Sequence, residues 1–454
     1  MDEARRDDDR LYTLSRERPA VAVVKMGVPL ICGMLIMVAY NLTDTYFVSL
    51  SHDDYQIAAV NLAYPLMMVM VALANIIGTG ASSLIARCLG AKDTERATST
   101  LTCALSLICI LGLIVAVFGL ILTNPLVTLL GARTNTFAYT AAYVRILVAG
   151  AIPTMGSYTI GALLRAEGSV RHSVVGMVAG TLANIALDPL LIFVCGLGVA
   201  GAAAATVLGN ACGLACGLSF YARGKTLIRP DRRYAVPRAP IVREILAIGL
   251  PASLETLLTS AAFVVNNQLA VGYGELTVAA VGIAQKIMSV GSYIYQGFAS
   301  GTQPIMGYAF GARDFDRMRQ TLKAAILVTS GTELCVMAVL GIAAPALVAV
   351  FTDSPEVIAT GAQVLRATMF ILPFVGATSI SRMSFQAAGK PLAALAITFV
   401  RQALLYVPLL LILNRLFGFA GMIWAQPVTE AIMMVVSVGM LTHMIEGERR
   451  RTTA

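Results

Sequence analysis

The feature that most constrains this chain is a run of about 20 apolar residues that recurs between short polar segments, as in membrane-spanning helices. Charged residues make up 13% of the chain, against about 25% in an ordinary soluble protein. The sequence therefore predicts an all-α membrane protein with twelve transmembrane helices. The twelve runs lie near residues 21–49, 55–80, 97–122, 137–162, 172–194, 199–221, 244–271, 276–303, 320–343, 357–380, 391–414 and 419–443.

Lysine and arginine are distributed unevenly between alternate loops. If the N-terminus is cytoplasmic, the outer loops hold only Arg133 and Arg415, while the inner segments hold many basic residues. Positive charge gathers on the cytoplasmic side of membrane proteins, so both termini are predicted to be cytoplasmic. The net charge of +8 then comes from basic residues on the cytoplasmic side, and no nucleic-acid partner is expected.

The second half of the sequence repeats the first. "CLGAKD" from Cys88 returns as "AFGARD" from Ala309, and "LGVAGAAAA" from Leu197 returns as "FGFAGMIWA" from Phe417, with an offset that stays nearly constant across the half. Six helices per copy make the copies parallel repeats, which predicts two bundles around a central cavity. The predicted parts are an N-terminal cytoplasmic tail (1–20), an N-lobe (21–221), a basic cytoplasmic linker (222–243), a C-lobe (244–443) and a C-terminal cytoplasmic tail (444–454).

Two acids of the first half lie inside predicted spans, where a carboxylate costs roughly 2.5–3.5 kcal/mol. Asp44 and Asp188 are each about five or six residues from the outer end of their runs, roughly 8–11 Å below the outer surface at ~1.5 Å per residue. Tyr40 is one turn from Asp44, and Asn184 is one turn from Asp188. Intramembrane acids usually mark ion or substrate pathways, so these residues are candidates for a functional site.

Tyr143 and Thr206 lie at a similar depth in the fourth and sixth runs and add neutral oxygens. Two acids in a poorly solvated site cannot both ionise cheaply, so the site can hold a proton. Oxygen ligands also suit Na⁺, for which the candidates are Asp44, Asn184, Asp188 and Thr206. The alternative is a set of polar residues that only satisfy neighbouring helices.

Pro189 directly follows Asp188 and lacks a backbone donor, so it loosens the helix beside the acid and allows bending there. The repeat supplies a comparison for this pair. Asp44 corresponds to Asn266, and Asp188 falls opposite Val407 beside a second proline. The second half therefore keeps the proline and lacks the acids, which indicates that the cation site belongs to the first half alone.

Five segments in this order resemble the multidrug and toxic compound extrusion (MATE) transporters: "GVPL…NLTDTYFVS", "GASSLIARCLGAKD", "LLRAEGSVRHS", "NIALDPLLIF" and "GTQPIMGYAFGARD". The last is similar to the bacterial branch of DNA-damage-inducible and Staphylococcus-type multidrug exporters. The resemblance implies antiport across the bacterial cytoplasmic (inner) membrane, in which H⁺ or Na⁺ enters while an amphipathic, usually cationic drug leaves. It also implies a cation site at Asp44, Asn184 and Asp188, with Tyr143 and Thr206 nearby, and helix bending at Pro29.

The candidates for substrate contact are Met34, Met37, Met67, Met177, Glu255 and Glu430. Methionine is soft and flexible, which suits a cavity that accepts many shapes, although core packing explains methionines equally well. Glu430 could meet a cationic drug or form a salt bridge with Lys286 or Arg401. Glu255 lies closer to the cytoplasmic end than the position that the family uses.

Other classes are less consistent with the sequence. A lipid-linked saccharide flippase shares the duplicated architecture, but such proteins usually have a basic cavity, whereas this chain has buried acids. No Ser/His/Asp set, HExxH motif or phosphate-binding glycine loop indicates an enzyme, and no filter segment indicates a channel. We expect no cofactor beyond the coupling H⁺ or Na⁺, and a monomer, because two complete lobes need no partner.

Overall fold

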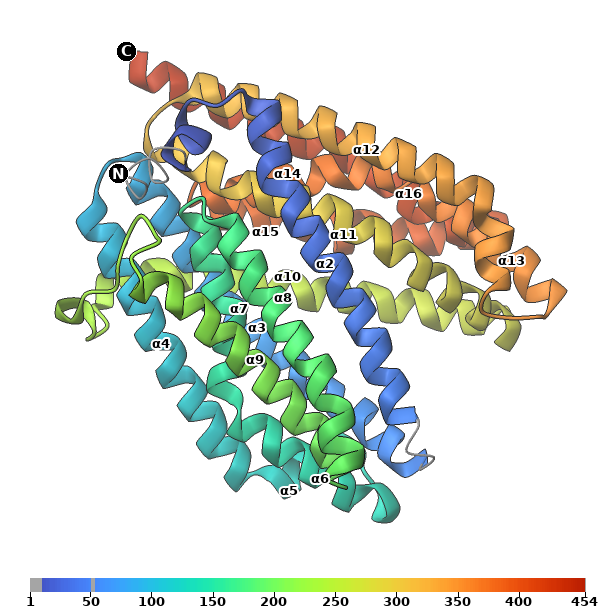
Figure 1. Cartoon of the computed structure of the whole chain (residues 1–454). Helices are drawn as coiled ribbons and strands as arrows, with labels where there is room; N and C mark the ends of the chain where they lie inside the picture. The colour runs from blue at the N-terminus through green and yellow to red at the C-terminus, as the bar shows by residue number, and fades with distance from the viewer. Residues whose placement is uncertain (1–9, 50–53, 454) are drawn as a thin grey trace. The chain divides into compact units, whose positions relative to one another are not determined.

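The computed structural model describes residues 10–49 and 54–453, with the side chains of these residues except 38–49, 54, 256, 257, 275 and 453. Within these ranges the chain is helical and contains no strand (Figure 1). The first-half elements are α2 (Pro19–Ser49), α3 (Asp54–Gly90), α4 (Thr94–Ile121), α5 (Thr123–Leu129), α6 (Thr134–Ala149), α7 (Ala151–Ala166), α8 (Val170–Pro189), the π-helix η1 (Leu190–Val194) and α9 (Val199–Ala222).

The linker between the halves holds a short 3₁₀-helix, η2 (Arg232–Tyr234). The second-half elements are α10 (Ala239–Val271), α11 (Glu275–Gly311), α12 (Phe315–Ala349), α13 (Pro355–Met369), α14 (Leu372–Ala387), α15 (Pro391–Phe399), the π-helix η3 (Val400–Tyr406) and α16 (Val407–Thr453).

The number of apolar spans agrees with the prediction. Nine helices in the described ranges are long and apolar enough to cross a membrane, and two helix pairs, α6–α7 and α13–α14, each form one more span with a bend of 54° and 45°. One of the nine, the stretch Pro391–Thr452, is 62 residues long and includes Gly418, whose φ of 59° and ψ of −139° are not helical. Two helices meet at Gly418, so this stretch contains two spans. The number of spans in the described residues therefore rises from eleven to twelve.

The two halves share unusual local structure, which confirms the duplication. Lys92 and Arg313 have φ values of 60° and 56°, and each is followed by an aspartate, Asp93 or Asp314, that caps the next helix. Each aspartate accepts a hydrogen bond of 2.9 Å from the backbone N–H three residues on. The "GAKD" and "GARD" segments are thus the same turn in the two copies.

The chain forms two compact units, Met1–Tyr12 with Cys32–Leu250, and Thr13–Ile31 with Pro251–Ala454. The predicted lobes change at helix boundaries, whereas these units change inside α2 and α10. Within the second unit, the first part of α2 packs closely on α11, because a Cβ built on Gly301 would lie 2.8 Å from the backbone nitrogen of Gly27. Small residues allow such close approach between membrane helices.

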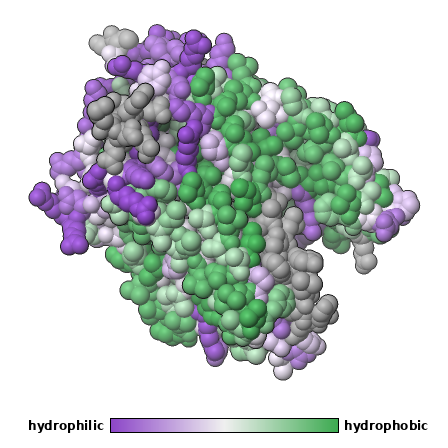
Figure 2. Space-filling model, in the orientation of Figure 1, coloured by the Kyte–Doolittle hydropathy of each residue, from purple (hydrophilic) through white to green (hydrophobic). Residues whose placement is uncertain are grey.

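The helices expose large aliphatic side chains along their length, as a chain in lipid does. Ile121, Leu129, Val194 and Ile342 are exposed by 71%, 83%, 77% and 82%. Figure 2 shows hydrophobic residues over much of the visible face and hydrophilic residues gathered mainly towards its margins. Exposure of so much apolar surface is unfavourable in water and favourable in the hydrocarbon of a bilayer. The structure is therefore that of a multi-pass membrane protein.

Candidate functional site

The candidate cation site of the first half is built on the contact between α8 and α9, which lie side by side in Figure 1. Gly180 of α8 and Gly209 of α9 meet backbone to backbone, because a Cβ on Gly180 would lie 2.8 Å from the carbonyl oxygen of Gly209. Just beyond the end of α8, a Cβ on Gly201 of α9 would lie 2.6 Å from the carbonyl oxygen of Leu191 in η1. Glycines thus allow α9 to approach the backbone of both α8 and η1 closely.

This packing places three predicted site residues along one interface. Asn184 faces Gly209, so Asp188, one turn further along α8, lies at the level of Ala205 and Thr206 on the antiparallel α9. Asp188, Asn184 and Thr206 are all buried, with exposures of 0%, 3% and 5%. The structure therefore brings these residues together away from water.

The hydrogen-bonding groups of these residues are used unequally. The Thr206 hydroxyl donates to the carbonyl oxygen of Ala202 at 3.0 Å, which leaves its lone pairs available. Neither polar atom of the Asn184 amide has a hydrogen-bond partner among the described residues. A buried amide without a partner costs roughly 1–3 kcal/mol, and a bound ion could supply the missing interaction.

Tyr143 on α6 is buried in the same part of the first unit, at 7% exposure. It belongs to an apolar cluster that includes Ala202 and Ala203 of α9, one turn before Thr206. Asp44 and Tyr40 lie in α2, but their side chains fall outside the described residues, so their part in the site stays a prediction.

Pro189 ends α8, and the next five residues form the π-helix η1. A proline cannot donate its backbone nitrogen, and wider π turns often occur beside functional sites. The second half also has a π-helix near its proline but on the opposite side, since η3 ends two residues before Pro408 whereas η1 begins directly after Pro189. Pro29, in contrast, lies inside a continuous α2.

The four candidate methionines are all partly buried and belong to the first unit. Met67 packs against the apolar cluster that contains Tyr143. Met177 of α8 packs over Gly33 of α2, next to Met34 in the sequence, while Met37 lies one turn beyond Gly33. Substrate contact by these residues stays a prediction.

Both candidate glutamates of the second half form salt bridges. Glu255 accepts a hydrogen bond from Arg382 at 2.5 Å, with both side chains less than a fifth exposed. Glu430 accepts from Arg401 at 3.0 Å, and its carboxylate is 2% exposed. Of the two salt-bridge partners considered for Glu430, Arg401 is therefore the one in contact, while Lys286 is exposed.

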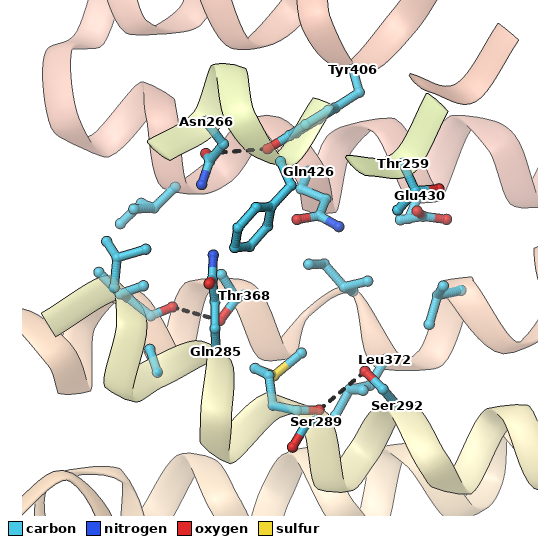
Figure 3. A pocket seen from close by; sticks show the side chains of 18 of the residues that line it. Thr259, Asn266, Gln285, Ser289, Ser292, Thr368, Leu372, Tyr406, Gln426 and Glu430 are labelled. Atoms are coloured by element: carbon cyan, nitrogen blue, oxygen red, sulfur yellow. Dashed lines mark hydrogen bonds between the residues drawn. The ribbon is translucent and has the colours of Figure 1, made fainter. Parts of the chain in front are cut away.

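The second unit contains a cavity of about 320 Å³ between α10, α11, α13, α14, η3 and α16 (Figure 3). The Arg401–Glu430 ion pair lies in its wall, together with the amides of Asn266, Gln285 and Gln426. Figure 3 shows the Asn266 and Gln285 amides pointing towards each other across the cavity, while Thr259 and Glu430 lie together at its other end.

Most of this cavity was not predicted from the sequence. A signal was nevertheless present in the repeat, because the alignment that pairs Leu197 with Phe417 also pairs Thr206 with Gln426. Gln285 lies in a run that contains no intramembrane acid and so gives no comparable signal.

The fold and these sites define a class: a multi-pass, all-helical membrane transporter with duplicated halves and a buried polar site in each. The profile of the MatE family matches residues 29–190 and 251–412, one segment in each half and of equal length, as the internal repeat requires. The chain belongs to the MatE family, which confirms the resemblance seen in the sequence.

Sequences of similar proteins match nearly the whole chain. "Multidrug export protein MepA" of Staphylococcus aureus (strain MSSA476) is 29% identical over 94% of both chains. Among solved structures, "Crystal structure of MATE in the bent conformation" superposes with a TM-score of 0.91 at 28% identity, covering 98% of this chain and 99% of that one. An outward-facing multidrug resistance MATE transporter of the MOP superfamily gives 0.90 at 29% identity, covering 96% and 98%.

Proposed function

We propose that this protein is a secondary active multidrug exporter that exchanges an inward-moving H⁺ or Na⁺ for an outward-moving amphipathic cation. The observation that carries the proposal is the burial of Asp188 together with Asn184 and Thr206 on the α8–α9 interface. An acid buried inside a membrane span is rarely only structural. The names of the Staphylococcus relatives, which describe multidrug export, support the outward transport of drugs.

Coupling follows from the neutralisation of one negative charge, that of the Asp188 carboxylate. An ionised carboxylate inside a membrane span is costly, and an H⁺ or Na⁺ bound at Asp188 would neutralise it beside the helix end at Pro189. The shape of α8 and η1 can therefore depend on occupancy, which gives alternating access of the two lobes a driving event. Asp44 and Tyr40 complete this site in the proposal, and Pro29 supplies a second bending point.

The proposed setting is the bacterial cytoplasmic membrane, with both termini in the cytoplasm and the protein acting as a monomer. The excess of Lys and Arg in the segments that would be cytoplasmic supports this orientation. Drug contact is proposed for Met34, Met37, Met67 and Met177, because flexible thioethers accept many ligand shapes. No catalysis and no bound cofactor are part of the proposal.

The test uses purified protein in liposomes with a pH-sensitive dye inside and no sodium present. Adding ethidium should move protons in wild type, and Asp188→Asn should abolish the movement. Asp353→Asn, which removes an exposed acid outside the spans, is the matched control and should behave as wild type.

If wild type moves no protons, the same comparison is repeated with a sodium gradient. Sodium-dependent ethidium transport that Asp188→Asn abolishes would identify Na⁺ as the coupling ion. Transport by Asp188→Asn equal to wild type would show the cation-site assignment to be wrong. No transport with either ion would favour a lipid-linked saccharide flippase.

A further inference from the structure

We propose that the cavity of the second unit is a separate binding site for small, uncharged aromatic molecules that carry both hydrogen-bond donors and acceptors. The proposal goes beyond the exporter function, because it assigns a second ligand chemistry to a part of the chain that lacks the coupling site. Three features of the cavity carry it: its place in the repeat, its balanced charge and its unused hydrogen-bonding groups.

The cavity of the second half contains the repeat counterparts of two residues of the proposed cation site. The alignment of "GVPL" with "GLPA" near the start of each half pairs Asp44 with Asn266, and the alignment near the end pairs Thr206 with Gln426. Both Asn266 and Gln426 line the cavity. The duplication has thus kept a polar site in each half, and the second copy has an amide where the first has a carboxylate.

The charges in the described lining cancel. Arg401 and Glu430 are its one cation and one anion, and they pair at 3.0 Å. A cationic ligand that bound Glu430 would have to take the place of Arg401, a side chain only 15% exposed, and break this ion pair. Breaking a buried ion pair is strongly unfavourable, and an anionic ligand would in turn lie against the Glu430 carboxylate. The site therefore disfavours a net charge of either sign.

The lining also has hydrogen-bonding groups that the described residues do not use. Tyr406 donates to Oδ1 of Asn266 at 3.2 Å, which leaves the Asn266 NH₂ group directed into the cavity. The amides of Gln285 and Gln426 have no partner among the described residues. Each amide offers a donor beside an acceptor, so a ligand with both on one edge satisfies them together.

The remaining lining fits an aromatic ring system. Phe263, Tyr295, Tyr406 and Met288 supply flat or soft apolar surfaces. The volume of about 320 Å³ lies at the lower end of the range of ligand pockets, roughly 300–1,000 Å³, which suits a compact molecule of two or three rings.

Three coumarin probes with the same ring test the charge preference: neutral 7-amino-4-methylcoumarin, a derivative with a trimethylammonium group, and a derivative with a carboxylate. Each is titrated against purified full-length protein in detergent, and its fluorescence is measured. We expect saturable binding of the neutral probe, at least tenfold tighter than either charged probe. Gln426→Leu should weaken the neutral probe about tenfold, and Gln363→Leu, an exposed glutamine outside the cavity on α13, should leave it unchanged.

Asn266→Asp provides the converse experiment, because it restores the acid of the first half without a new countercharge. The variant should bind the trimethylammonium probe more tightly than wild type and the neutral probe less tightly. Thermal unfolding of each variant establishes that it is folded before titration.

Two outcomes would overturn the proposal. If the cationic probe binds wild type as tightly as the neutral probe and Glu430→Gln abolishes its binding, the cavity is a cation site. If no probe saturates in folded wild-type protein, the cavity holds only water. Both outcomes are separable from failure of the exporter function, which is measured in liposomes and depends on Asp188.

Discussion

Asn184 of α8 packs directly against Gly209 of α9, because a Cβ built on Gly209 would lie 2.7 Å from the Cβ of Asn184. The same added atom would lie 2.8 Å from the backbone carbonyl oxygen of Gly180. The backbone cannot rotate away as a side chain can, so this glycine fixes the distance between the two helices that hold the proposed cation site.

Gly209→Ala should therefore separate α8 from α9 and impair both stability and transport. Overpacking a close contact costs typically about 1–3 kcal/mol. Ethidium transport in liposomes and the unfolding temperature in detergent are the measurements. Gly331→Ala in α12 is the control, because nothing lies within 4 Å of a Cβ there. Equal effects of the two substitutions would show that helix contact does not set the site.

The acids of the first half should be needed, and an acid added to the second half should not replace them. Asp44→Asn should reduce proton-coupled ethidium transport at least tenfold, because the coupling site loses a carboxylate. Asn266→Asp should retain proton coupling through the unchanged first half. Retained coupling in Asp44→Asn, with coupling lost in Asn266→Asp, would reverse the assignment of the two halves.

The two π-helical segments allow a comparison of their prolines. Pro189→Ala restores a backbone donor beside Asp188 and should stiffen the junction of α8 with η1, which should slow coupled transport several-fold. Pro408→Ala, in the half without the acid, should have a smaller effect. Proton movement driven by ethidium measures both. An equal loss in the two variants would assign the prolines a general structural role.

Apolar runs predicted the spans well, because hydrocarbon requires a continuous apolar helix of fixed length wherever the chain crosses. They could not predict the bends between α6 and α7 or between α13 and α14. The run 137–162 is continuous in hydropathy, and its bend lies at Gly150, where a Cβ would overlap the Val207 side chain. Hydropathy does not mark this break, although Gly150 and Pro153 in the first turn of α7 are local signals of a helix boundary, and the contact with Val207 requires a glycine there.

The relative placement of candidate site residues was predictable where they lie on a single helix. Asn184 and Asp188 are one turn apart, so their shared face followed from helical geometry alone. The partner of Glu430 could not be predicted in this way. Lys286 and Arg401 were both available, and the choice depends on which face of each helix points inward. The structure leaves Lys286 exposed and places Arg401 beside the carboxylate.

Glu167, between α7 and α8, holds the start of the linker that joins the halves. Its Oε2 accepts hydrogen bonds from the backbone N–H groups of Leu227 at 3.0 Å and Ile228 at 3.3 Å. The side chain is completely buried. Removal from water raises the pKa of Glu167 to about 8, against the opposing effects of the Ile228 N–H, the Tyr221 hydroxyl and the charge of Arg10.

This shift makes stability depend on pH in a defined direction. Between the ordinary pKa of 4.5 and about 8, folded protein holds a proton on Glu167 that unfolded protein has lost, so stability falls as pH rises through this window. The unfolding temperature in detergent should fall by about 3–5 °C from pH 6 to pH 8. Glu167→Gln keeps a carbonyl acceptor for both N–H groups but cannot ionise, and it should lose most of this dependence. Glu356→Gln removes an exposed acid and should keep the wild-type slope; if Glu167→Gln keeps it too, another group is responsible.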